Sequence, residues 1–165
     1  MTIPEDVAAC LNGYLERCAP GRVVQFGPEG TLPSAWAERG YIQRLIQPDL
    51  DLDQDLAGCD QFDLALVLDA PKILSTIATR QLLARLRNYS AGAILTAFDI
   101  DSARQSECWS VAEFLGLGFR RVSEARQLNS HYWIYRYDIY DYKITPDWLN
   151  SRHWANPEQW DRRRW

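Results

Sequence analysis

The alternation of apolar and polar residues divides the chain into short helices and strands. Apolar residues recur at helical spacing over residues 3–18, which predicts an N-terminal helix that ends before Ala19-Pro20-Gly21. Thr2-Ile3-Pro4-Glu5 has the spacing of a capping box at the start of this helix. The run Phe62–Leu68, which is apolar except at Asp63, predicts a strand that is covered on both faces, as in a parallel sheet.

Strands and helices alternate on either side of that run. The predicted elements are strand 22–26, helix 33–39, strand 42–46, strand 62–68, a helix that ends near Asn88, strand 91–98, helix 106–117, and an antiparallel pair of strands at 119–123 and 131–140. This order favours a single α/β domain over residues 1–140, with a mostly parallel sheet flanked by helices.

The last predicted strand has two different faces. One face is expected to form core under a covering helix, and it carries Trp133, Tyr135, Tyr137 and Ile139. The other face is expected to be half exposed, with an arginine–aspartate pair to the neighbouring strand, and it carries Tyr132, Ile134, Arg136, Asp138 and Tyr140.

Length and charge narrow the function classes. A chain of 165 residues has room for one core, and its net charge of −4 gives no general attraction to nucleic acid or anionic lipid. The longest apolar run, residues 64–68, is too short to cross a bilayer. Glu5 and Asp6 stand where a signal peptide would be basic, so we expect a soluble, cytoplasmic protein.

The cysteines and histidines do not have the spacing of a metal site. Cys10, Cys18, Cys59 and Cys108 form no C-x-x-C motif, and the chain has only 2 histidines. We therefore expect no metal, and four buried, reduced thiols as is usual in the cytoplasm.

Three stretches, in this order, resemble the class I S-adenosylmethionine (SAM)-dependent methyltransferases. They are Val23-Val24-Gln25-Phe26-Gly27-Pro28-Glu29-Gly30, the run from Phe62 to Asp69 with the later Ala91-Gly92-Ala93-Ile94-Leu95, and Leu115-Gly116-Leu117-Gly118-Phe119 before the last strand. The resemblance covers residues 22–140 and is greatest to a small bacterial branch of unassigned activity. It implies a Rossmann-like, methyltransferase-type sheet, with SAM as the possible cofactor and a trimmed sheet edge near residues 46–62.

The resemblance also implies a set of cofactor contacts: Gly27, Glu29, Gly30 and Asp49. Gly27 matches the first glycine of the family's loop, whereas Glu29 stands in place of the second and Gly30 is one position out of step. A carboxylate at Glu29 would repel the carboxylate of SAM unless the loop turns it outward. Asp49 is the nearest candidate for the acid that holds the ribose, and it also fits a solvated acidic loop.

Asp69 is the candidate catalytic residue. In Asp69-Ala70-Pro71-Lys72 it takes the place of the acid or amide that, in amino-methyltransferases, accepts a hydrogen bond from the target NH₂. Lys72 replaces the aromatic residue of that motif. The alternative is that Asp69 only caps the helix that follows. Since no lysine precedes Lys72, the lysine-dependent chemistry of ribose 2′-O-methyltransferases is excluded.

The C-terminal extension, residues 141–165, is rich in tryptophan and arginine. Four of the 7 tryptophans fall within the last 18 residues, namely Trp148, Trp154, Trp160 and Trp165, and they are the candidate partner-binding residues. The extension packs on its own domain, docks on a second copy or another protein, or stacks on single-stranded nucleic acid. Its nearly balanced charge makes the nucleic-acid alternative the weakest of the three.

Two functions remain open on the sequence. The first is a degenerate methyltransferase-like domain that acts as a binding or interaction protein, through its cleft or its aromatic extension. The second is an active SAM-dependent methyltransferase with an atypical cofactor loop and an unknown methyl acceptor. Fold alone does not separate them, because the cofactor motifs carry the activity.

Overall fold

The computed structural model describes residues 3–27, 41–46, 61–101, 110–127 and 130–141, together with the single residues 51, 54, 56, 152, 156, 158 and 162. Its sheet has 6 strands in the order β2-β1-β3-β4-β6-β5. The parallel strands are β1 (Val23–Gly27), β2 (Tyr41–Leu45), β3 (Phe62–Leu68) and β4 (Ala91–Asp99). β6 (Ser130–Asp138) is antiparallel to both β4 and β5 (Arg120–Gln127). The predicted mostly parallel α/β sheet with a C-terminal antiparallel pair is confirmed.

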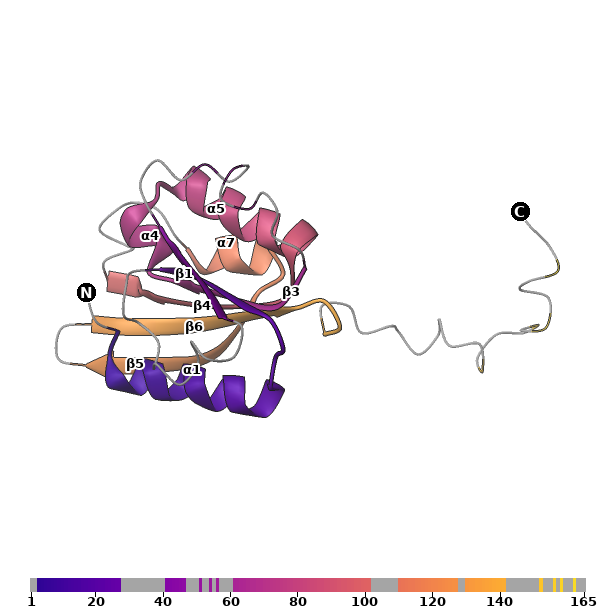
Figure 1. The fold of residues 1–165 in the computed structure, drawn as a ribbon, viewed down its shortest axis with the longest axis horizontal. Coiled ribbons are helices and arrows are strands. Elements are labelled where there is room, and N and C mark those ends of the chain that lie inside the picture. The colour runs from indigo at the N-terminus through magenta and orange to yellow at the C-terminus, as the bar shows by residue number, and fades with distance from the viewer. Residues whose placement is uncertain are drawn as a thin grey trace.

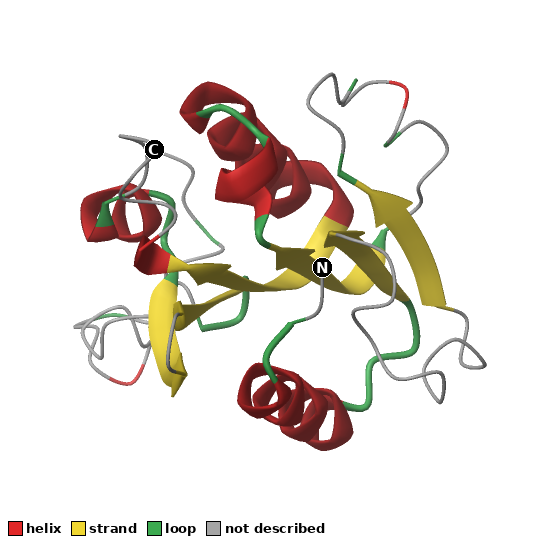
Figure 2. Cartoon of the chain, turned by 90° about the vertical axis from the view of Figure 1, so that its left-hand side faces the viewer, coloured by secondary structure: helices red, strands yellow, loops and turns green. Residues whose placement is uncertain are grey.

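Helices cover both faces of the sheet. Among the described helices, α1 (Glu5–Cys18) lies on one face, and α4 (Ala70–Ile73), α5 (Thr76–Arg85) and α7 (Val111–Gly116) lie on the other (Figures 1 and 2). A π-helical turn, η1 (Leu86–Ser90), joins α5 to β4. The side chains of β3 alternate between two separate cores: Leu64, Leu66 and Leu68 pack with α1, and Ala65 and Val67 pack with the other helices. This burial on both faces explains why residues 64–68 are all apolar.

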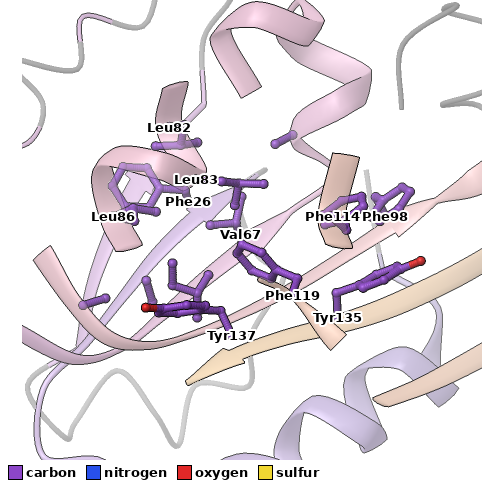
Figure 3. Packing of buried hydrophobic residues seen from close by; sticks show 14 of the residues in the cluster. Phe26, Val67, Leu82, Leu83, Leu86, Phe98, Phe114, Phe119, Tyr135 and Tyr137 are labelled. Carbon is purple, nitrogen blue, oxygen red and sulfur yellow. The ribbon is translucent and has the colours of Figure 1, made fainter. Parts of the chain in front are cut away.

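An aromatic stack fixes α7 on the sheet. The ring of Phe114 lies 4.4 Å from that of Tyr135 and 4.8 Å from that of Phe98, measured between centroids, and Phe119 meets Phe114 edge-on (Figure 3). Such pairs contribute roughly 0.5–1.5 kcal/mol each beyond the burial of their area. The face of β6 that carries Tyr135 is thus core under a helix, as expected.

The opposite face of β6 differs from the prediction. Tyr132 and Ile134 are buried in the core beneath α1 rather than half exposed. Arg136 pairs with Asp138 of its own strand, and not across strands. Ile139 was expected in the core, yet it is exposed because β6 ends at Asp138.

The beginning and the end of α1 also differ from expectation. The helix begins after Pro4, which is its N-cap residue, whereas the capping-box spacing places the N-cap at Thr2, and Thr2 lies outside the described residues. Cys18 is exposed and Cys10 is half buried, whereas both were expected to be buried; both are free thiols.

Some predicted elements cannot be compared with the structure. Helix 33–39, the first part of helix 106–117, Cys59 and Cys108 lie outside the described residues. In the part of the chain that is described, no helix is long and apolar enough to span a membrane.

Candidate functional site

Three neighbouring strands bring acidic and phenolic groups together at the carboxyl edge of the parallel strands. Asp69 directly follows β3, Asp99 ends β4, and Tyr132 of β6 is paired in register with Asp99. The Tyr132 hydroxyl donates a hydrogen bond of 2.8 Å to Asp69 Oδ2. The backbone N–H of Asp99 donates one of 3.3 Å to Asp69 Oδ1. Both oxygens of the Asp69 carboxylate are therefore engaged within the protein.

Lys72 completes this group, which we call the edge cluster (Asp69, Lys72, Asp99 and Tyr132). Its Nζ lies 3.5 Å from Asp99 Oδ2 and 3.9 Å from Asp69 Oδ1, and 5.6 Å from the centre of the Tyr132 ring. Asp69 is 1% exposed, whereas the Lys72 side chain is 22% exposed. One cation therefore faces two buried carboxylates and covers them from the solvent side.

The backbone of Asp69 explains how its side chain reaches the cluster. Asp69 has a left-handed conformation, with φ of 51°, which is uncommon outside glycine and costs about 1 kcal/mol or more. This turn joins β3 to α4, with the Asp69 N–H donating to the Ala97 carbonyl at 2.9 Å. The side chain makes no capping hydrogen bond to α4, so the alternative that Asp69 only caps the helix is wrong.

The surroundings of Asp69 and Tyr132 in the edge cluster favour the protonated form of each side chain. Burial raises the pKa of Asp69, opposed by the hydrogen bond from Tyr132 and the positive charge of Lys72. Burial and the neighbouring Asp69 raise the pKa of Tyr132, which keeps the phenol protonated and donating. Each oxygen of Asp69 can accept a second hydrogen bond, but Asp69 is 1% exposed, so a ligand would first have to displace the groups that cover it.

A histidine lies beside the cluster. Nε2 of His131 accepts hydrogen bonds from the indole N–H of Trp133 at 3.1 Å and from Nε of Arg126 at 3.2 Å. Nε2 of His131 also lies 3.5 Å from Glu124 Oε2, so three polar side chains surround this nitrogen. The His131 backbone N–H donates to Asp99 Oδ1 at 3.2 Å, which ties this residue to the edge cluster.

Gly27 is the one predicted cofactor contact that the structure describes. A Cβ at this position would lie 2.9 Å from the Cβ of Leu68, closer than two such atoms approach. The glycine is thus required by the contact between β1 and β3. Glu29, Gly30, Asp49 and the four tail tryptophans (Trp148, Trp154, Trp160 and Trp165) lie outside the described residues.

The SAM site that the resemblance implies stays a prediction, because Gly27 is the one of its residues that the structure describes. At Gly27, the space that a Cβ would fill is taken up by the side chain of Leu68. The Asp69 carboxylate accepts its hydrogen bonds from Tyr132 and Asp99. A direct catalytic role for Asp69 stays a prediction. Within the ranges described here, no three histidine, cysteine, aspartate or glutamate side chains gather as metal ligands would.

Sequence reasoning missed most of the edge cluster. It singled out Asp69 by its motif position and noticed Lys72 only as a departure from that motif. One signal was present: Asp69 and Asp99 each follow an apolar strand, and the carboxyl ends of parallel strands meet at one edge. Tyr132 could not be found this way, because its position depends on the register of β6 against β4.

Solved structures with a similar fold are methyltransferases. The magnesium protoporphyrin IX methyltransferase (ChlM) of Synechocystis PCC 6803 with bound SAM has a TM-score of 0.56 and 13% identity, over 79% of this chain and 77% of that chain. The same enzyme with bound SAH has a TM-score of 0.51 and 9% identity, over 79% of this chain and 81% of that chain. At such identities the likeness establishes the fold alone.

Sequence comparisons give a family but no activity. No curated protein matches this chain. Residues 5–165, which include the C-terminal extension, match a family model described as "Family of unknown function (DUF6231)". The chain is therefore a methyltransferase-like α/β protein that belongs to the DUF6231 family.

Proposed function

We propose that this domain functions by binding another protein, and that it uses the methyltransferase-type sheet as a scaffold without transferring a methyl group. One observation carries the proposal: the carboxylate of Asp69 is buried, and both its oxygens accept hydrogen bonds from the protein itself. In the amino-methyltransferases that the sequence resembles, the group at this position has to face the methyl acceptor.

The position of Lys72 supports the same proposal. Its ammonium group lies 3.9 Å from Asp69 Oδ1 and 3.5 Å from Asp99 Oδ2, and the Lys72 side chain is more exposed than either carboxylate. Withdrawing Lys72 would remove its positive charge from beside two buried carboxylates, which is costly in a low-dielectric environment. A ligand would have to supply a cation of its own to replace it.

The contact residues in this proposal are the tryptophans of the extension, Trp148, Trp154, Trp160 and Trp165. Tryptophan and arginine are enriched among the residues that dominate binding energy at protein interfaces, and the extension contains both in number. A protein partner fits this composition better than nucleic acid does, since the chain as a whole carries a net charge of −4.

Calorimetric titration with SAM and with its demethylated product, SAH, tests the proposal. We expect no heat of binding at ligand concentrations up to about 1 mM, which corresponds to a binding free energy weaker than about −4 kcal/mol. The protein must be shown to be folded under the same conditions, by circular dichroism. Micromolar binding of either ligand would contradict the proposal and would point to an active enzyme.

A positive test uses the extension. A protein that cross-links to the full chain is purified and titrated against the wild type and against a chain with all four tail tryptophans replaced by alanine. We expect the replacement to weaken binding by at least about 30-fold, the loss of one hot-spot residue of about 2 kcal/mol. Equal affinities would remove the extension from the interface.

The second candidate function is SAM-dependent methyl transfer. Asp69 lies at the carboxyl edge, where ligands bind to open α/β sheets, and the similar structures of the Synechocystis enzyme hold SAM and SAH. If titration detects SAM, the Asp69→Asn variant distinguishes two roles. A group that contacts the acceptor would lower turnover and leave SAM affinity unchanged, whereas a group that only holds the edge cluster together would mainly lower stability.

A further inference from the structure

The amino edge of the parallel strands, opposite the edge cluster, contains an open hollow. It lies where α1 ends, β3 and β4 begin and β6 ends, on the right of the sheet in Figure 1, and its volume is about 590 Å³. This size is within the range of sites that hold drug-sized groups, about 300–1,000 Å³. Its lining includes Cys18, Asp63, Tyr89, Asp138 and Tyr140.

The rim of the hollow exposes aromatic and aliphatic surface. Tyr89 is 69% exposed, Tyr140 is 93% exposed and Ile139 is more than half exposed. These three side chains come from η1 and the end of β6, and they gather around one opening. Apolar groups gathered around a concavity mark a surface that another group covers, whereas single exposed apolar residues need no such explanation.

The C-terminal extension begins next to this rim. Tyr140 lines the hollow, and Asp141, which ends the continuously described part, is hydrogen-bonded through its N–H to the Asp138 carbonyl at 3.2 Å. Residues 142–165 follow at once. Trp148 is seven residues beyond Asp141, a reach of up to roughly 24 Å, so the first tail tryptophan can return to the hollow.

Charge favours the same contact. Residues 142–165 contain five basic and three acidic side chains, a net charge of +2, so residues 1–141 carry −6 of the chain's total of −4. Asp63, Asp138 and Arg87 line the hollow, and Asp138 is also paired with Arg136 of its own strand. The opposite net charges of the extension and of residues 1–141 therefore favour contact between them.

We propose that residues 146–165 dock in this hollow of their own chain, with a tail tryptophan in the cavity and the tail arginines near Asp63 and Asp138. Docking within one chain is favoured over docking between copies, because a short linker gives an effective concentration of about 1 mM, far above ordinary protein concentrations. The partner of the proposed function would then have to displace the extension from the hollow.

The free thiol of Cys18 provides the test. Cys18 is exposed and lines the hollow, while Cys10 is half buried on the same helix and is absent from its lining. The alkylation rate of each cysteine is measured by peptide mass spectrometry, under native conditions, on the full chain and on a chain that ends at Thr145. We expect Cys18 to react about tenfold more slowly in the full chain, the factor for a segment docked nine-tenths of the time. Cys10 should react equally in both chains.

A point variant tests the proposal without truncation. Trp148→Ala in the full chain should speed up the alkylation of Cys18, whereas Leu115→Ala, a loss of exposed apolar surface on α7, should leave it unchanged. If truncation also speeds up Cys10, the shortened chain has lost its core, and the point variants decide. Equal Cys18 rates in the full chain and in Trp148→Ala would then overturn the proposal.

Concentration separates the two possible sources of the docked segment. Protection of Cys18 that does not change with protein concentration supports docking within one chain. Protection that increases with concentration would mean that a second copy supplies the segment, and would overturn the proposal. The inference uses the extension named under the proposed function, but thiol reactivity requires neither SAM nor a partner, so either can fail without the other.

Discussion

Replacing Lys72 by methionine should destabilise the protein measurably, although the residue lies near the surface. Lys72 Nζ stands 3.5 Å from Asp99 Oδ2 and 3.9 Å from Asp69 Oδ1. At an effective dielectric constant of about 20, each contact corresponds to a gross attraction of roughly 4–5 kcal/mol, part of which is offset by desolvation. Breaking a fully buried pair costs about 3–5 kcal/mol, and the 22% exposure of Lys72 reduces our expectation to about 2–3 kcal/mol.

The loss should depend on pH in a definite direction. Burial already raises the pKa of Asp69, and Lys72 is one of the groups that oppose this rise. Without Lys72 the folded protein therefore binds a proton at Asp69 at a higher pH than the wild type does. Proton uptake by the folded state increases stability as pH falls, so the cost of Lys72→Met should shrink between neutral pH and about pH 5.

Urea unfolding followed by far-ultraviolet circular dichroism measures this effect at both pH values. Arg120→Met is the matched control, because Arg120 pairs with Asp141 at 3.4 Å but both side chains are about half exposed. An exposed pair of this kind contributes less than about 1 kcal/mol. A cost for Lys72→Met below about 0.5 kcal/mol at neutral pH, or one that is equally large at low pH, would refute this account of the edge cluster.

Three further changes test other parts of the structure. Gly27→Ala should cost about 1–3 kcal/mol in urea unfolding, because the new Cβ would lie 2.9 Å from the Cβ of Leu68, which no rotamer change can move. Phe114→Ala should cost about 3–5 kcal/mol, since it removes the ring that stacks on Tyr135 at 4.4 Å; a loss below about 1 kcal/mol would contradict this packing. Burial, with a smaller contribution from the hydrogen bond to Cys18, raises the pKa of Tyr14 from 10.0 to about 12. The unfolded chain therefore loses the Tyr14 proton at a lower pH than the folded protein does. The free energy of unfolding should fall by roughly 2–3 kcal/mol between pH 10 and 12, and this loss should be missing in Tyr14→Phe.

The fold was predictable where one sequence signal was enough. The run Phe62–Leu68 coincides with β3, because a strand between two helical layers must be apolar on both faces. Tyr132 and Ile134 were misjudged because Arg136 and Asp138, on the same face of β6, are polar. α1 covers Tyr132 and Ile134 and reaches Arg136, whose guanidinium lies 5.6 Å from the centre of the Tyr14 ring, and a period-2 pattern carries no information about which strand face a helix covers.

The edge cluster was harder to predict than the sheet, for a related reason. The position of Asp69 follows from the strand that precedes it, but its function depends on contacts with residues 30 and 63 positions away along the chain. Those contacts need the order β3-β4-β6, the register of β6 and the left-handed turn at Asp69. A motif specifies the residue type, whereas only the assembled sheet shows that the Asp69 carboxylate is buried and hydrogen-bonded to other residues of the protein.

The two edges of the sheet therefore differ in a way that directs the search for function. Open α/β sheets bind their ligands at the carboxyl edge, yet in the described part of that edge the acids are neutralised by Lys72 and bonded to Tyr132 and Asp99. The amino edge has the hollow, an exposed thiol at Cys18 and the point from which the extension departs. If function had stayed at the carboxyl edge, neutralising Lys72 should alter ligand binding more than stability. If the functional surface is instead the extension, the same substitution should lower stability and leave partner binding intact. Trp148→Ala should then weaken partner binding and leave the free energy of unfolding unchanged.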